Sequence, residues 1–170
     1  MDIGMIVARL IHVLAGIFWV GAMLFVTWYL MPALNESGPA GGKVMAAIGR
    51  RGFIKVVPVI AILTMLSGIW LYWRISAGFD PVYLRSGPGH MYGTGGILAI
   101  VAFVIGMTMS RPAMMKAASL AQSAENADVA EREAMLAEST RQREKGLRAG
   151  RFVAWLLLAS AVTMAIGRYV

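Results

Sequence analysis

Four long apolar runs constrain the fold of this 170-residue chain more than any other feature of its sequence. They cover about residues 4–34, 53–75, 92–109 and 152–168. A helix needs about 20 residues to cross the hydrocarbon core of a bilayer, so each run is long enough, or nearly so, to span it. The runs do not alternate with the two-residue period of a membrane β-barrel. The sequence therefore predicts an all-α integral membrane four-helix bundle, with residues 1–170 forming one transmembrane domain.

The composition agrees with a membrane protein and excludes several kinds of chemistry. Hydrophobic residues make up 58% of the chain and the mean hydropathy is +0.66, whereas soluble domains are roughly 45–50% apolar. The net charge of +7 comes from cations that flank the apolar runs, so they indicate membrane topology and not nucleic-acid binding. The chain has no cysteine, which excludes disulfides, thiolate metal sites and thiol catalysis.

The cations also predict the orientation. The links 35–52 and 110–151 lie on the same side of the membrane, since two spanning segments separate them. Twelve Lys and Arg residues lie in these links or at their edges, and only Arg9, Arg74, Arg85 and Arg168 lie on the other side. Cytoplasmic loops are enriched in Lys and Arg. We therefore expect both links in the cytoplasm and both termini on the extracytoplasmic side.

The second link, about residues 110–151, is rich in Ala, Glu, Arg, Met and Gln, which favour helices. It has one plausible break, at residues 126–128, so we predict that the third and fourth helices continue into a cytoplasmic antiparallel helical hairpin. The apolar side chains expected at its seam are Met114, Met115, Leu120, Met135 and Leu136. A hairpin without chemistry is the favoured interpretation, and a docking surface for a partner protein is the alternative.

Arg9 and His12 are placed one helical turn apart inside the first apolar run. Polar groups in a membrane helix are costly and usually face the bundle interior or a functional site. Arg9 is close enough to the outer end for its guanidinium to reach the interface. His12 is then about 4.5 Å deeper. The simplest interpretation of His12 is a hydrogen bond to a neighbouring helix, and the alternative is a cofactor ligand.

Three features favour the cofactor. The helix face of His12 carries Gly16 and Trp19, and small residues beside a histidine leave room for a flat group, although they also permit close helix packing. The only other histidine, His90, lies at the outer mouth of the third helix, at a similar depth. Arg9 is positioned to pair with a propionate. Haem b, with His12 and His90 as candidate axial metal ligands, fits these features. The alternative for His90 is a mobile glycine-rich loop in which it meets only water.

The stretch HVLAGIFWVGAMLF, which begins at His12, resembles the first-helix signature of small bacterial four-helix membrane proteins. This superfamily includes copper-resistance protein D-like proteins and the N-terminal membrane domain of some bacterial urate oxidases. Residues 63–79, LTMLSGIWLYWRISAGF, are similar to other four-helix proteins of the group. The resemblance implies a multi-pass protein of the bacterial inner membrane, with haem or copper handled near the outer leaflet and His12 as a ligand. Unlike the urate oxidases, this chain has no CxxCH motif.

Three functions follow as hypotheses. The first is electron transfer through one haem b, with quinone or a periplasmic electron carrier as partner. The second is a non-catalytic accessory subunit of a larger respiratory or photosynthetic membrane complex. The third is copper binding or transport, in which Met5 and Met91 would join the two histidines. An enzyme acting alone is disfavoured, because the sequence shows no paired carboxylates in the membrane, no Ser–His–acid set and no phosphate loop.

Overall fold

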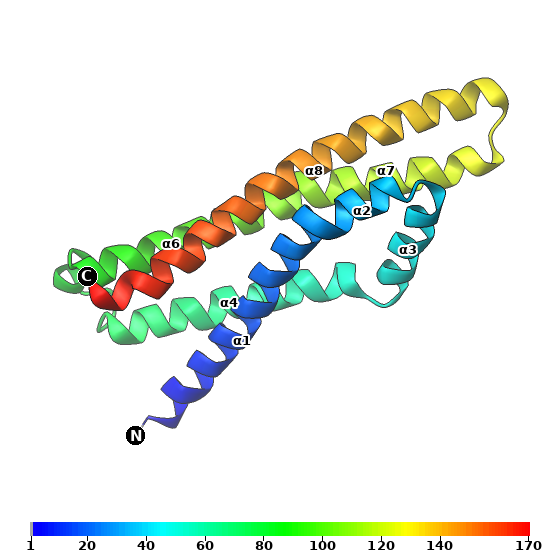
Figure 1. The fold of residues 1–170 in the computed structure, drawn as a ribbon. Coiled ribbons are helices and arrows are strands. Elements are labelled where there is room, and N and C mark those ends of the chain that lie inside the picture. The colour runs from blue at the N-terminus through cyan, green and yellow to red at the C-terminus, as the bar shows by residue number, and fades with distance from the viewer. Residues whose placement is uncertain (1) are drawn as a thin grey trace.

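The computed structural model describes residues 2–170, and these residues form helices with no strand among them. Four continuous helical stretches are long and apolar enough to cross a membrane, as the apolar runs predict: Ile3–Glu36, Phe53–Ile75, Gly87–Asn126 and Val129–Tyr169. They suggest a multi-pass membrane protein. The chain termini lie toward one end of the elongated bundle, and the two longer links lie toward the other (Figure 1).

Three of the four stretches change helix type within their length. The first consists of α1 (Ile3–Phe25), the π-helix η1 (Val26–Leu30) and α2 (Met31–Glu36), and α3 (Pro39–Arg50) then leads to α4 (Phe53–Ile75). The short α5 (Pro81–Leu84) precedes the third stretch, which consists of α6 (Gly87–Ile105), the π-helix η2 (Gly106–Ser110), α7 (Arg111–Ser123) and the 3₁₀-helix η3 (Ala124–Asn126). The last stretch is α8 (Val129–Ile166), followed by the 3₁₀-helix η4 (Gly167–Tyr169).

Both π-helices directly precede a proline in the first turn of the next helix, Pro32 in α2 and Pro112 in α7. Proline has no N–H to donate, and its ring crowds the carbonyl four residues earlier. A wider turn relieves this crowding, because the residue before each proline donates to a carbonyl five residues back: Met31 to Val26, and Arg111 to Gly106. The helices therefore continue past both prolines instead of ending at them.

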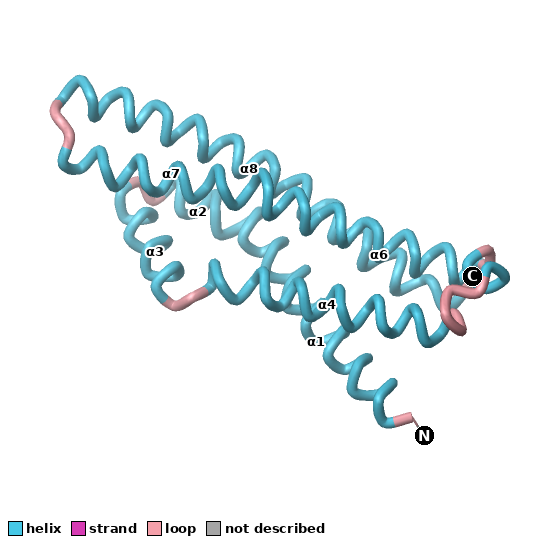
Figure 2. Tube along the Cα trace, turned by 180° about the vertical axis from the view of Figure 1, so that it is seen from behind, coloured by secondary structure: helices cyan, strands magenta, loops and turns pink. Residues whose placement is uncertain are grey.

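The membrane-length helices pack as two pairs, α1 with α4 and α6 with α8 (Figures 1 and 2). The second pair is close because small residues meet across it. The Ser160 hydroxyl donates a 2.7 Å hydrogen bond to the Gly95 carbonyl. One small core joins the two pairs, and its buried members are Trp19, Ala61, Ala99, Ala102, Val153 and Leu157. Most other large apolar side chains face outward, as expected for a lipid-facing surface.

The helical hairpin of α7 and α8 is confirmed, and its break lies where predicted. Helix η3 ends at Asn126, and α8 begins after Asp128, whose carboxylate accepts a 2.9 Å hydrogen bond from the Glu131 amide. The predicted seam was partly wrong, because Met115 and Leu136 are 55% and 45% exposed. Met114 does belong to the seam, since its side chain packs against Gly146. The fully buried residues of the seam are all small: Ala113, Ala117, Ala124, Gly146, Ala149 and Gly150. They let the two helices approach more closely than methionine and leucine would.

Helix α6 begins at Gly87, before the start of the apolar run at residue 92. The Ser86 hydroxyl caps it by accepting a 3.2 Å hydrogen bond from the Gly89 amide, and Pro88 occupies its first turn. His90 therefore lies in the first turns of a helix and not in a glycine-rich loop.

Candidate functional site

His12 lies on the face of α1 that packs against α4, and its side chain is half-buried. Its Nδ1 is 2.8 Å from the backbone carbonyl oxygen of Thr64. A carbonyl oxygen can only accept, so Nδ1 carries the proton and donates it. In the neutral imidazole, Nε2 is then left with a lone pair. The structure thus fixes the tautomer of His12 through a contact between two helices.

The sequence of α4 provides a flat surface for the imidazole ring. A Cβ atom added to Gly68 would come within 2.7 Å of His12 Cε1 and 3.0 Å of Nδ1, so only glycine fits beneath the ring. The Thr64 hydroxyl donates to the carbonyl of Ile60, at 2.9 Å. The Ser67 hydroxyl lies 3.1 Å from the Thr64 carbonyl but closer, at 2.6 Å, to the carbonyl of Leu63. Glycine at this position therefore permits both the close approach and the hydrogen bond.

Nε2 of His12 has no hydrogen-bond partner within residues 2–170. Metal-ligating histidines almost always donate the other ring N–H to a carbonyl or carboxylate, which orients the ring and makes the ligating nitrogen more basic. His12 has this arrangement, with the Thr64 carbonyl as the orienting group. The donor chemistry thus fits one axial ligand to haem iron, with Nε2 as the ligating atom.

The other residues predicted around His12 differ in their surroundings. Arg9 is exposed and forms no ion pair with any residue that the structure describes. Gly16 lies against α4, where a Cβ would be 3.6 Å from the Thr64 methyl group. Trp19 is 4% exposed and packs edge-to-face on Phe103, with 6.3 Å between the ring centroids. The space that small residues leave on this face is therefore largely filled by α4, and Trp19 belongs to the core.

The structure does not bring His12 and His90 together. His90 is exposed on α6, and the backbones of α1 and α6 are not adjacent. The two helices touch through the side chains of Trp19 and Phe103, about two turns deeper in the bundle than His12. Met5 on α1 and Met91 on α6 are separated in the same way. Across residues 2–170 there is no cluster of three or more His, Asp or Glu side chains that could hold a metal ion. This arrangement therefore does not favour a metal site in which His12 and His90 of one chain are both ligands.

A second polar contact at the same end of the bundle did not emerge from the sequence. Arg74, in the last turn of α4, donates a 2.6 Å hydrogen bond to the carboxylate of Asp2, which caps α1. The Arg74 guanidinium holds the pKa of Asp2 below its ordinary value of 3.8, and the hydrogen bond from the Met5 amide acts in the same direction. The signal was available, since opposite charges stand at the outer ends of the first two apolar runs.

Comparison with known proteins does not identify a family for this chain. No family model matches the chain, and no curated protein or solved structure is similar enough to it to indicate a family.

Proposed function

We propose that this chain is a multi-pass protein of the bacterial inner membrane that binds one haem b near the outer leaflet and takes part in electron transfer. The observation that carries the proposal is the oriented imidazole of His12, whose Nδ1 is bonded to the Thr64 carbonyl at 2.8 Å while Nε2 is left without a partner. When bound, haem supplies reversible one-electron exchange at its iron.

The residues of the chain would have separate roles. His12 would ligate iron through Nε2. The Thr64 carbonyl would hold the ring in orientation and increase the basicity of Nε2. Arg9, which is exposed one turn nearer the outer end, would pair with a propionate. His90 is left out of this proposal because it is exposed on α6, whose backbone is not adjacent to that of α1.

The orientation of the protein is part of the proposal. The link between α1 and α4 and the hairpin of α7 and α8 carry most of the Lys and Arg residues, and they extend toward the same end of the bundle (Figure 1). The positive-inside rule assigns this end to the cytoplasm. His12 would then lie in the extracytoplasmic half of the membrane, where a periplasmic carrier or quinone could exchange electrons with the haem.

The absorption spectrum of the purified protein tests haem binding. The full chain is expressed with a haem precursor in the medium, and wild type is compared with His12→Ala and with the matched control His90→Ala. We expect a Soret band in wild type and His90→Ala, and its loss in His12→Ala, at unchanged helix content by circular dichroism. A colourless wild type, or a full Soret band in His12→Ala, would contradict haem ligation by His12.

An accessory subunit of a larger respiratory or photosynthetic membrane complex is the second candidate. The same contact supports it, since an imidazole that is bonded to Thr64 and packed on Gly68 joins α1 to α4 without any cofactor. A colourless protein that migrates with a larger complex on native gels of host membranes would favour this candidate. A colourless protein that binds cuprous ion through His12 would instead favour copper handling, although no contact in the structure gathers a copper ligand set.

A further inference from the structure

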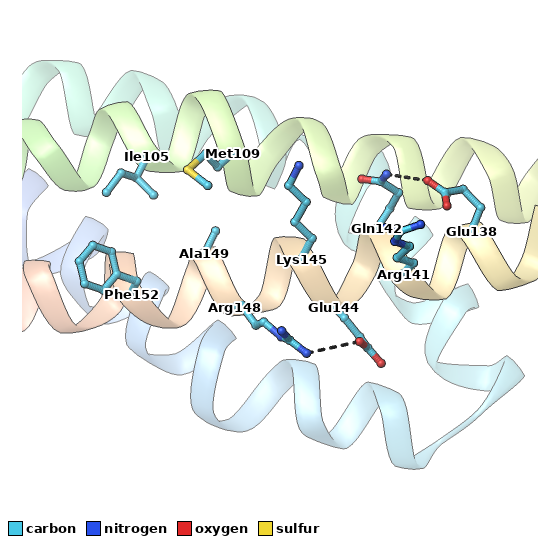
Figure 3. Close-up of a pocket in the computed structure, with 10 residues that line it drawn as sticks. All are labelled: Ile105, Met109, Glu138, Arg141, Gln142, Glu144, Lys145, Arg148, Ala149 and Phe152. Atoms are coloured by element: carbon cyan, nitrogen blue, oxygen red, sulfur yellow. Dashed lines mark hydrogen bonds and ion pairs between the residues drawn. The ribbon is translucent and has the colours of Figure 1, made fainter.

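A groove that His12 does not line lies between α8 and the stretch formed by α6 and η2 (Figure 3). Its volume is about 890 Å³, which is ample for part of a lipid molecule. At one end it is lined by Ile105, Met109, Ala149 and Phe152, and at the other end by charged side chains of α8. The groove therefore passes from an apolar to a charged environment along a single helix.

The passage from an apolar to a charged lining follows from the sequence of α8. Arg141, Lys145, Arg148 and Phe152 recur at intervals of four, three and four residues, so they share one face of the helix. The last cation of this face is directly followed by Ala149 and Phe152, at the start of the apolar run. Trp155, one turn further along, is 59% exposed and packs against Trp28, as aromatic residues do at a membrane interface. The groove thus crosses the predicted membrane boundary.

The charged end has two cations that form no direct ion pair with any described residue. The hydrogen bond from Gln142 lowers the pKa of the nearby Glu138 carboxyl, and the charges of Lys116 and Arg141 help to lower it. The Glu138 carboxylate accepts a 2.7 Å hydrogen bond from Gln142 and lies 3.7 Å from the Lys116 ammonium. Glu144 pairs with Arg148 at 3.8 Å. Arg141 and Lys145 form no ion pair with any residue from 2 to 170. Figure 3 shows Lys145 extending from α8 toward the helix that carries Ile105 and Met109, with the Glu144–Arg148 pair on the opposite edge of α8.

We propose that this groove binds one anionic phospholipid of the adjacent leaflet, with its phosphate at Arg141 and Lys145 and an acyl chain along Ile105, Met109 and Phe152. Two unpaired cations complement the phosphate. The apolar half, where Met109 is 47% and Phe152 54% exposed, matches an acyl chain and has no use for a soluble phosphate. Basic pockets beside transmembrane helices bind acidic lipid head groups in the same way. This inference does not depend on haem binding.

Native mass spectrometry of the purified full chain tests the proposal. The protein is titrated with dioleoyl phosphatidylglycerol and, separately, with dioleoyl phosphatidylcholine. We expect tighter binding of the anionic lipid by wild type. Each cation is worth about fivefold in affinity near a membrane surface, so Arg141→Ala combined with Lys145→Ala removes about 25-fold of the preference. Inorganic phosphate, added alone at millimolar concentration, is expected not to displace the lipid.

The matched control removes the same charge from the same helix outside the groove. Arg143→Ala combined with Arg151→Ala changes two cations that do not line it, and this variant is expected to keep the preference for phosphatidylglycerol. Equal losses in the two double variants would overturn the proposal, since the effect would then be one of total charge. Displacement of the lipid by inorganic phosphate would also overturn the proposal. So would a wild-type protein that binds phosphatidylglycerol no more tightly than phosphatidylcholine, a comparison that needs no variant.

Discussion

The imidazole of His12 and the bare backbone of Gly68 form a close contact between α1 and α4. The ring occupies the space that a side chain at residue 68 would need. Its Nδ1–H donates a hydrogen bond to the Thr64 carbonyl. The hydroxyl of Ser67 is 3.5 Å from the same nitrogen, too far to compete with the carbonyl for its proton. One imidazole thus packs closely on α4 while its Nε2 has no hydrogen-bond partner within residues 2–170.

Replacing Gly68 by alanine tests the contact. The added Cβ would be 2.7 Å from His12 Cε1, and we expect destabilisation of about 1–3 kcal/mol, with loss of any Soret band. The same substitution in a His12→Ala background is expected to cost much less, since the ring that clashes is gone. Thermal unfolding of the two single variants and the double variant measures this coupling.

Gly21→Ala is the control, because a Cβ there meets nothing within 4 Å. It is expected to be neutral or stabilising by up to about 1 kcal/mol through helix propensity. Equal costs at Gly21 and Gly68 would argue against a specific His12–Gly68 contact.

The Asp2–Arg74 pair gives a pH-dependent contribution at the outer ends of the same two helices. Arg74 lowers the pKa of Asp2 in the folded protein below 3.8, so the unfolded chain takes up the proton at a higher pH. The contribution is therefore fully present above about pH 4 and is lost as the pH falls through the lowered pKa. We expect Asp2→Asn to reduce stability at neutral pH and to approach wild type as the pH falls below 3.8. A difference that does not shrink as the pH falls would exclude the ionised carboxylate as its source.

At the level of helices, small residues determine which pairs pack closely. The α6–α8 pair is held by the Ser160–Gly95 hydrogen bond and by alanine and glycine contacts, and the hairpin seam is built in the same way. Hydrophobicity predicted the hairpin but only part of its seam, because exposed methionines and buried alanines are both apolar in sequence. The distance between two helices depends on the smallest side chains between them, which a hydrophobicity pattern does not distinguish.

The spans, the π-helices and the contact between α1 and α4 were predictable from the sequence to different degrees. The four spans follow from transfer of apolar side chains out of water, which depends on composition alone. The π-helices had a signal in Pro32 and Pro112, since proline within a helical run forces a kink, a break or a wider turn. The Thr64–His12 hydrogen bond was not predictable in detail, because it depends on the relative shift and rotation of α1 and α4. The sequence indicated only that His12 faces a neighbour.

The hydroxyl of Ser160 provides a test at this level. Ser160→Ala removes a hydrogen bond between helices at a side chain that is 5% exposed. Such bonds in membrane proteins average about 0.6 kcal/mol and reach about 1.7 kcal/mol, so we expect a loss in this range in an unfolding titration. Thr108→Ala is the control, since Thr108 bonds only to Val104 within its own helical stretch, and it is expected to have little effect. Equal losses would contradict the role assigned to Ser160.

For the whole molecule, two helix pairs share one small core, and most of the remaining apolar surface faces outward. This distribution suits a bilayer. Both termini lie toward one end of the bundle and the cation-rich links toward the other (Figure 1). The overall arrangement is thus consistent with the charge distribution in the sequence, from which we propose cytoplasmic links and extracytoplasmic termini.

Single thiols test this orientation, because the natural chain has no cysteine. We expect a membrane-impermeant maleimide to label Tyr169→Cys in intact bacterial cells and to label Glu133→Cys only after lysis. Both positions are exposed, so accessibility within the fold does not distinguish them. The opposite labelling pattern would reverse the orientation and place His12 in the cytoplasmic half of the membrane.

The protonation of the His12 ring is the most direct measure of whether the chain offers an iron ligand. The chain has only two histidines, so solid-state ¹⁵N NMR of histidine-labelled protein in lipid shows two imidazoles, and His90→Ala assigns them. At alkaline pH, where histidines are neutral, we expect His12 of haem-free protein to be protonated at Nδ1 and unprotonated at Nε2. The exposed His90 is expected to show a mixture of both tautomers. A proton on Nε2 of His12, or a mixture like that of His90, would contradict the hydrogen bond from Nδ1 to the Thr64 carbonyl. It would also contradict the proposal that Nε2 ligates iron.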